Sequence, residues 1–588
     1  MNNKFGAITL KEALPRLVAA YNKGKLVPFT GAGISAPSIP LWKKMVQNLS
    51  KSCDLKLPRD FGATPQQLIQ YSEEAVTRLI RQSPSKFVRT VKESLGYVGD
   101  QQPTITPQCQ SLSNIWWPLV ITTNYDTMFV DAYTKAQKDF GPSPIGIFGR
   151  NQLDCHSMLS KLNTGINTAY WALQGYFGKS MNGKLLEEEI VLGYRQYRNA
   201  SYSNPLFRAV FGEVFRNNSL LFLGSGLTED YFLGLFGEVL EKFGSNPHTH
   251  CALFSEQDAD RIDHRFLNTK LNIVAIFYKD AGVKYKGLAP ALDLLHHSIQ
   301  KGSTRLWKMG YAYRSFDEKN ISKAGLDLEI SADPMPASSE GECLVYSAGM
   351  DANGIMFKTI GREYLESRYK AYDRNNFKQI KTTQCWQYYN DKKETHIYAA
   401  VARNNIGASS YRSRDLRMVY TAFKQTLEVL HRRYSVINIM LLATGKNRIF
   451  PPIYSLNAML KAYRDFIREY EPGEINKVRC TIKIHVTDPS VILYIRKNAL
   501  EIEEIISCDD IRLNIEIHDR GEIERFQIYV ASHQPLASLS EYYSIDKKYW
   551  DVRIEPLPYF GQTLRPDARD ELYALGLIPG STIVYARK

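Results

Sequence analysis

The chain has 588 residues, a formal net charge of +13 and no strongly biased tract. Hydrophobic residues make up 44%, charged residues 23% and aromatic residues 12% of the chain, a profile that excludes long disordered or fibrous segments. The length exceeds what one hydrophobic core supports and predicts about three domains. Lys and Arg are scattered, so nucleic-acid binding is an alternative that rests on charge alone.

Neither the amino terminus nor the cysteines point to export or metal binding. MNNKFGAITLKEAL lacks the basic-then-apolar order of a signal peptide, and no window has about 18 consecutive apolar residues. We therefore expect a cytoplasmic protein without membrane contact. The eight cysteines, at positions 53, 109, 155, 251, 343, 385, 480 and 508, form no CxxC half-site. Zinc, other metals and disulfides are not predicted.

Residues 1–305 alternate between apolar runs and helical patterns. TLKEALPRLVAAYNKG predicts a helix and KLVPF a strand that enters the glycine turn GAGIS, after which residues 41–115 have a mostly helical pattern. Further strands are predicted at WWPLVITTNYD, YWALQGYF, NNSLLFLGSGLTED, THCALFS and LNIVAIFY. This alternation predicts an α/β fold, a doubly wound Rossmann-type parallel sheet whose ligands bind at the carboxyl ends of the strands.

The second half of the chain differs from the first in composition and in the order of its predicted elements. Residues 306–340 are polar and rich in turn formers, and predict a linker with an edge hairpin. Residues 341–500 predict a second α/β domain, with strands ECLVYSAG, HIYAAVA, SVINIMLLATG and TIKIHVTD and two amphipathic helices. Residues 501–588 predict a small α+β module that contains a short helix at RPDARDELYALG.

Three motifs follow predicted strands of the first domain. In GAGIS, Gly31 and Gly33 would let the backbone approach a pyrophosphate and point amides at it, although such turns are also common in purely structural loops. Asn124 and Asp126 of TTNYD could hold a ribose and orient a water, and the alternative is an Asx turn that caps the next helix. GSG, followed by Asp230, could accommodate a second ribose.

In order and spacing these motifs resemble the sirtuin superfamily over about residues 10–300. GAGIS matches the family's GAGxS, TTNYD its TxNxD and LLFLGSGLTEDYF its GxS turn. The likeness is closer to the bacterial defence branch, the sirtuin-like NAD hydrolases of Thoeris and related antiphage systems, than to the deacylases. Deacylases carry a four-cysteine zinc ribbon, which the cysteine spacing here excludes, and their GIPDFR segment is replaced by SIPLW.

One position departs from the family. The resemblance places a catalytic histidine in an LHG motif, and the matching segment here is LQG, with Gln174. Glutamine cannot act as a general base, and His156 is the nearest histidine that could substitute. Three alternatives follow: catalysis by a water that Asn124 positions, NAD binding without turnover, or an inactivated enzyme.

The second α/β domain contains a further glycine turn, TGKNR, which could hold a diphosphate at a helix amino terminus. Its pattern weakly resembles a macro domain, a fold that binds ADP-ribose derivatives. An ordinary structural domain is an alternative, and so is the accessory region that joins sirtuin-like proteins to short Argonautes. This second predicted nucleotide site consists of Gly445, Lys446, Asn447 and Arg448.

The leading hypothesis is an NAD⁺ hydrolase that releases nicotinamide and ADP-ribose and depletes cellular NAD during antiphage defence. The alternative is a sensor of NAD or its derivatives, or an accessory subunit of a short-Argonaute complex. NAD serves as substrate, with no other cofactor. The resemblance implies a homo-oligomer or a partner from the same defence operon, and nucleic acid only through such a partner.

The predicted catalytic residues are Asn124, Asp126 and Gln174, and the predicted NAD-binding residues are Gly31, Ala32, Gly33, Ser35, Thr123, Gly224, Ser225, Gly226 and Asp230.

Overall fold

The computed structural model divides the chain into two compact units, Met1–Gly302 and Ser303–Lys588, and each is described by itself. The structure describes residues 7–62, 64–97, 103–137, 145–164, 168–193, 195–196, 199–200, 204–225, 227, 236–237, 239–240, 248–280, 285–301, 305–309, 325–337, 339–351, 354–357, 359–368, 373–390, 393–402, 414–444, 452–469, 479–507, 510–519, 522–555, 567, 569, 571–573 and 575–587.

The first unit is built on an eight-stranded sheet in which every neighbouring pair is parallel. The spatial order is β1-β8-β7-β6-β2-β3-β5-β4. The strands are β1 (Ala7–Thr9), β2 (Leu26–Thr30), β3 (Leu119–Thr122), β4 (Ile145–Phe148), β5 (Thr168–Ala172), β6 (Ser219–Leu223), β7 (His250–Ser255) and β8 (Ile273–Tyr278). Every residue of β2, β3 and β5 is buried, as expected for central parallel strands that are covered on both faces.

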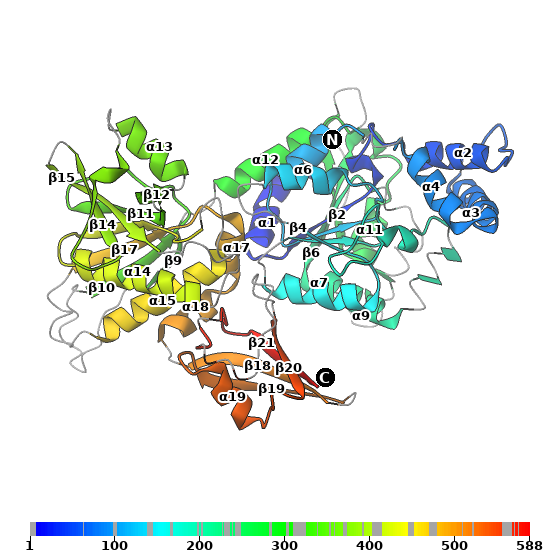
Figure 1. Cartoon of the computed structure of the whole chain (residues 1–588). Helices are drawn as coiled ribbons and strands as arrows, with labels where there is room; N and C mark the ends of the chain where they lie inside the picture. Colours follow the sequence, from blue (N-terminus) through cyan, green and yellow to red (C-terminus); the bar gives the residue numbers. More distant parts are fainter. Residues whose placement is uncertain are drawn as a thin grey trace. The chain divides into compact units, whose positions relative to one another are not determined.

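Helices cover both faces of this sheet (Figure 1). One layer contains α1 (Leu10–Asn22), α5 (Pro107–Ser113), α6 (Met128–Ala136) and α12 (Leu288–Gln300), and the other contains α7 (Gln152–Thr164) and α9 (Pro205–Asn217). The helix α11 (His264–Leu271) packs on β8. Three further helices, α2 (Trp42–Ser52), α3 (Pro65–Gln82) and α4 (Pro84–Ser94), pack on one another and are inserted between β2 and β3.

The second unit contains two sheets. The larger has a parallel centre, in the order β15-β11-β16-β17-β10, and antiparallel neighbours at its edges. Its strands are β9 (Arg305–Met309), β10 (Gly325–Ser331), β11 (Glu342–Asp351), β12 (Gly354–Phe357), β13 (Phe377–Gln379), β14 (Cys385–Asn390), β15 (Lys393–Val401), β16 (Val436–Met440) and β17 (Arg479–His485). The smaller sheet, in the order β19-β18-β21-β20, comprises β18 (Asp510–Asp519), β19 (Glu522–Ala531), β20 (Trp550–Glu555) and β21 (Thr582–Arg587).

Six helices accompany these sheets in the described part of the second unit. They are α13 (Thr359–Arg368), α14 (Arg414–Leu430), α15 (Pro452–Arg468), α17 (Pro489–Lys497), α18 (Ala499–Ser507) and α19 (Leu536–Tyr542). The helices α14 and α15 pack on each other, and α15 also packs on α18. The two amphipathic patterns of the sequence thus correspond to a helix pair within this unit.

The structure confirms the predicted α/β class and its doubly wound parallel sheet, and it corrects two details. The predicted edge hairpin is present, because β9 and β10 pair in antiparallel fashion, but β10 also pairs with β17 and so belongs to the sheet of the second unit rather than to a linker. The short helix predicted at RPDARDELYALG is also wrong, since the described residues there form turns and a bridge from Glu571 to Pro535. Among the described residues, no helix is long and apolar enough to cross a membrane.

Candidate functional site

Four of the predicted motifs lie together at one edge of the first sheet. The strands β6, β2, β3 and β5 are consecutive neighbours and parallel, so their carboxyl ends meet at this edge. Gly224, Gly31, Thr123 and Leu173 each follow directly from one of these strands. The sequence therefore placed the GSG, GAGIS, TTNYD and LQG motifs correctly relative to the sheet.

The GAGIS loop and the GSG turn interlock through their backbones. Gly31 N donates to Leu223 O at 2.9 Å, and Gly33 N donates to Gly224 O at 2.9 Å. A Cβ on Gly33 would lie 2.7 Å from Gly224 Cα, so glycine is required for this approach. Because both glycine amides bind protein carbonyls, the expectation that they point at a pyrophosphate is wrong. Ala32, between them, is exposed.

A buried chain of hydrogen bonds joins GAGIS to TTNYD. Asn124 Nδ2 donates to Gly31 O and to Ser35 Oγ, each at 3.2 Å, and Ser35 Oγ donates to Asp126 Oδ2 at 2.9 Å. Thr123, half-buried beside them, donates through its backbone N to Thr30 O at 3.1 Å. The amide and carboxylate of TTNYD thus fix the loop that follows β2.

Asp126 also makes the hydrogen bond of an Asx turn, the structural role that the sequence offered as an alternative to ligand binding. Its Oδ1 accepts from Met128 N, the first residue of α6, at 3.1 Å. Burial raises the pKa of this carboxyl to about 6, although the hydrogen bonds from Ser35 and Met128 oppose the shift. Asp126 is 4% exposed, so its observed contacts are with protein groups.

Gln174 lies at the end of β5 and contacts TTNYD through a tyrosine. Tyr125 Oη donates to Gln174 Oε1 at 3.1 Å and lies 2.7 Å from Val191 O. The backbone of Gln174 accepts from Val191 N at 3.0 Å, and Gly175 follows with φ of +94°. His156 is exposed on α7, and no contact among the described residues joins it to Gln174 or Asn124. The structure therefore offers no support for His156 as a substitute base.

Two side chains at the start of α5 make contacts that the sequence did not predict. Thr106 Oγ1 donates to Ile34 O at 2.6 Å, and Gln108 Nε2 donates to Gly33 O at 3.2 Å and to Ala36 O. Thr106 precedes Pro107 at the start of this helix, an arrangement that is a known helix-start signal. The signal marks the helix, but nothing local indicates that its side chains hold the GAGIS loop.

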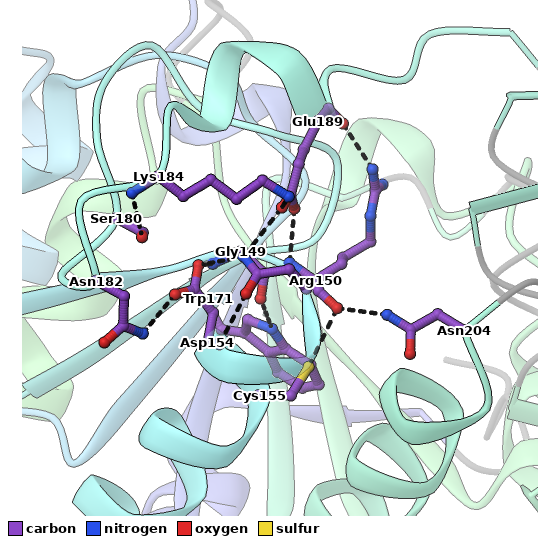
Figure 2. A network of polar contacts seen from close by, with 11 residues as sticks. Gly149, Arg150, Asp154, Cys155, Trp171, Ser180, Asn182, Lys184, Glu189 and Asn204 are labelled. Carbon is purple, nitrogen blue, oxygen red and sulfur yellow. Dashed lines mark hydrogen bonds and ion pairs between the residues drawn. The ribbon is translucent and has the colours of Figure 1, made fainter. Parts of the chain in front are cut away.

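The segment after Gln174 is held by a buried arginine, whose contact with Glu189 is shown in Figure 2. Arg150 donates through Nη1 to Leu173 O at 2.7 Å and through Nη2 to Glu189 O at 2.6 Å. These two carbonyls lie at either end of residues 174–188, so one guanidinium joins both ends of this segment. Arg150 is 6% exposed.

Carboxylates complete this network. Burial favours a higher pKa for Glu189, but hydrogen bonds from Arg150 N at 2.7 Å, from Asn151 Nδ2 at 3.1 Å and from Lys184 lower it below its ordinary value. Asp154, fully buried, accepts from Gly149 N at 2.8 Å and from Asn182 Nδ2 at 2.6 Å, as Figure 2 shows. The network is satisfied by protein groups and serves to position the segment after β5.

A cavity of about 290 Å³ opens beside the GSG turn, at the carboxyl ends of β6, β7 and β8. Gly224, Ser225 and Leu227 line one side, and Tyr285, whose ring lies against Gly33, lines another. Asp258, Arg261 and Asp263 supply charged groups, and the other lining residues include Leu253, Phe254 and Phe266.

Several predicted residues cannot be placed. Gly226 and Asp230, and all of Gly445, Lys446, Asn447 and Arg448, lie outside the described residues. In the part of the chain that the structure describes, no group of three His, Cys, Asp or Glu side chains is arranged to hold a metal ion. Seven cysteines fall within that part and all are free and buried.

Comparison with known families gives a match over part of the first unit. Residues 118–276 match the model of the SIR2-like domain, a range that contains Asn124, Gln174 and Gly224 but begins after the GAGIS loop. No curated protein matches the chain. Part of the first unit is therefore similar to a SIR2-like domain, and β1 and β2 of its sheet precede the matched range.

Proposed function

We propose that the first unit binds NAD⁺ and hydrolyses its nicotinamide–ribose bond to give nicotinamide and ADP-ribose. The observation that carries the proposal is the cavity of about 290 Å³ beside Gly224 and Ser225, at the strand ends of a SIR2-like domain. Such an edge is where open parallel sheets bind nucleotides.

The lining suits the adenosine half of a dinucleotide. Phe266, Leu253 and Tyr285 offer apolar and aromatic surface to a base, and Asp258 and Asp263 offer carboxylates to ribose hydroxyls. A dinucleotide that starts here and crosses the GAGIS loop brings its other half toward β3 and β5. The nicotinamide ribose would then face Asn124 and Gln174.

The chemistry makes modest demands on the protein. Cleavage passes through a cationic ribose, so a fixed water and a water-excluding pocket supply most of what is needed. Gln174 can orient a water through its amide but cannot accept a proton, and Asp126 is already bonded to Ser35. We therefore assign Asn124 and Gln174 to positioning the water and the ribose.

A nucleotide sensor is the second candidate, and Gln174 favours it. Without a base at this position, bound NAD or a derivative would remain intact, and its binding would act on the second unit or on a partner.

The biological role proposed for the hydrolase follows from its resemblance to the defence branch. Loss of NAD would stop the infected cell, so the enzyme would be held inactive until a trigger arrives. Assembly as a homo-oligomer, or with a partner from the same operon, would supply that control.

Incubation of the purified full chain with NAD tests both candidates, with nicotinamide release and calorimetric binding measured with and without candidate triggers. The hydrolase predicts nicotinamide release that Asn124→Ala abolishes and that the control Asn114→Ala, at the exposed end of α5, leaves unchanged. NAD binding without release in all conditions would favour the sensor. Absence of binding would overturn both.

A further inference from the structure

A second cavity of the first unit lies beneath α1, at the amino-terminal ends of the strands, whereas the candidate site lies at their carboxyl ends. Its volume is about 190 Å³. Leu26 and Ser219, the first residues of β2 and β6, line it together with Cys251 of β7 and Val274 of β8. The first cavity is lined by residues at the carboxyl ends of β6, β7 and β8, so the two cavities lie at opposite ends of these strands.

Much of the lining is apolar. The helix α1 contributes Ala13, Leu17 and Ala20, and β1 contributes Ile8. An apolar cavity of about 150 Å³ is large enough to bind benzene, so this space fits a short hydrocarbon group. Arg16 and Thr249, which also line the cavity, are exposed, so its opening is at the protein surface.

The charges that act on this cavity are basic. Burial raises the pKa of the Cys251 thiol to about 12, and the Arg16 guanidinium opposes that rise. Burial lowers the pKa of His248, which also lines the cavity, and Lys25 and Lys23 lower it further. Arg16 itself lines the cavity, and Lys25 directly precedes the lining residue Leu26.

The acidic residue nearest to Arg16 along α1 is already bound elsewhere. Glu12 accepts from Thr9 N at 2.7 Å and from Thr9 Oγ1 at 2.8 Å in the capping box of the helix. The cavity therefore combines the Arg16 guanidinium at its opening with a largely apolar interior.

We propose that this space, here called the α1 cavity, binds a small carboxylate that carries a short hydrocarbon chain. The chain would occupy the space between α1 and the strand starts, and the carboxylate would lie at Arg16 near the opening. The inference is independent of the proposed function, because the α1 cavity lies at the amino-terminal ends of the strands and the candidate site at their carboxyl ends.

Calorimetric titration of the full chain with hexanoate and with hexylammonium, which share a chain and differ in charge, tests the proposal. We expect hexanoate to bind with a dissociation constant on the order of 1 mM, given its few heavy atoms, and hexylammonium to bind at least about tenfold more weakly. Arg16→Ala should weaken hexanoate about tenfold or more. Lys11→Ala removes the same charge from an exposed position of the same helix outside the lining, and should leave binding unchanged.

A filling substitution locates the site. Ala20→Trp places an indole in the α1 cavity and should abolish hexanoate binding, with circular dichroism used to verify the fold. Equal binding of the two probes, binding that survives Arg16→Ala, or no detectable binding of hexanoate would each overturn the proposal. If Ala20→Trp does not fold, the comparison of Arg16→Ala with Lys11→Ala decides.

Discussion

Gln174 occupies the position at which the proposed hydrolase would gain most from a group that accepts a proton. Its Oε1 accepts from Tyr125 Oη, and the side chain is 9% exposed. An imidazole at this position would lie beside the same hydroxyl, at the end of β5 and next to the strand that carries Asn124. Replacement of this one side chain therefore tests how much a general base would add to the proposed hydrolysis.

Gln174→His should raise the rate of nicotinamide release by about 10² to 10⁴-fold, the range that general base catalysis contributes. NAD affinity should change little. Gln174→Ala serves as control, because it changes the side chain without adding a base, and should give no gain. A wild-type rate that is already high, with no gain from histidine, would show that an ordered water alone carries the reaction.

Asp126 predicts a pH dependence of stability. Its pKa is raised to about 6 in the folded chain from an ordinary 3.8, so the folded state favours the protonated form. The stabilisation that this preference provides is complete below about pH 4 and is lost as pH rises through about 6. The difference between the folded and unfolded pKa of this carboxyl corresponds to a free energy of about 3 kcal/mol.

Asp126→Asn removes this titration and keeps an acceptor for Met128 N. The denaturant midpoint of the variant should therefore rise relative to wild type between about pH 4 and pH 6.5 and level off above. An opposite slope would mean that the hydrogen bonds from Ser35 and Met128 outweigh burial, and that the carboxylate is preferred in the folded chain.

At the scale of elements, the segment after β5 depends on one side chain from the turn after β4. Arg150 supplies donors to Leu173 O, which is fully buried, and to the carbonyl of Glu189, which is half-buried. Loss of a buried partner costs about 1–3 kcal/mol for each group left unsatisfied.

Arg150→Met keeps the apolar stem and removes both donors. We expect a destabilisation of about 2–6 kcal/mol and faster hydrogen exchange at Tyr176 N, Leu186 N and Val191 N, which close this segment. Arg89→Met, on an exposed ion pair with Glu93 at 3.8 Å, should change neither. Exchange that is unchanged in Arg150→Met would show that the segment holds itself.

At the scale of the whole chain, the division at Gly302 makes the first unit a candidate for independent folding. Its sheet is complete within residues 7–278, and its α12 ends at Gln300. A fragment of residues 1–302 should fold cooperatively and bind NAD with the affinity of the full chain, as measured by calorimetry. A folded fragment that has lost NAD binding would assign part of the site to the second unit.

How much of the fold the sequence predicts depends on burial. The strands β2, β3 and β5 are buried on both faces and appear as continuous apolar runs, so their pattern is unambiguous. β1 and β4 are short edge strands, and β4 is buried only at alternate residues, which leaves too weak a pattern to detect.

How much of the candidate site the sequence predicts also depends on the strength of local patterns. Its motifs could be predicted because each follows a strong strand, whereas Arg150, Thr106 and Gln108 could not, because their roles are set by distant backbone carbonyls. The glycine amides were misassigned for a related reason. Whether an amide binds a ligand or a neighbouring turn depends on how close β6 lies to β2, which no local pattern specifies.

The contact between Gly33 and Gly224 limits what can be learned from sequence comparison. A Cβ on Gly224, which has φ of +63°, would lie 2.5 Å from Ile34 N, and a Cβ on Gly33 would strike Gly224 itself. In protein cores, a substitution that makes one side chain smaller is often compensated by a larger neighbouring side chain. The contact between Gly33 and Gly224 is between backbone atoms, which no substitution can make smaller. Both positions should therefore remain glycine in divergent relatives, including those that have lost catalysis. Conservation of these two glycines therefore indicates only that the fold at the strand ends is kept. An inactive relative would be distinguished from an active one only at positions such as Asn124 and Gln174.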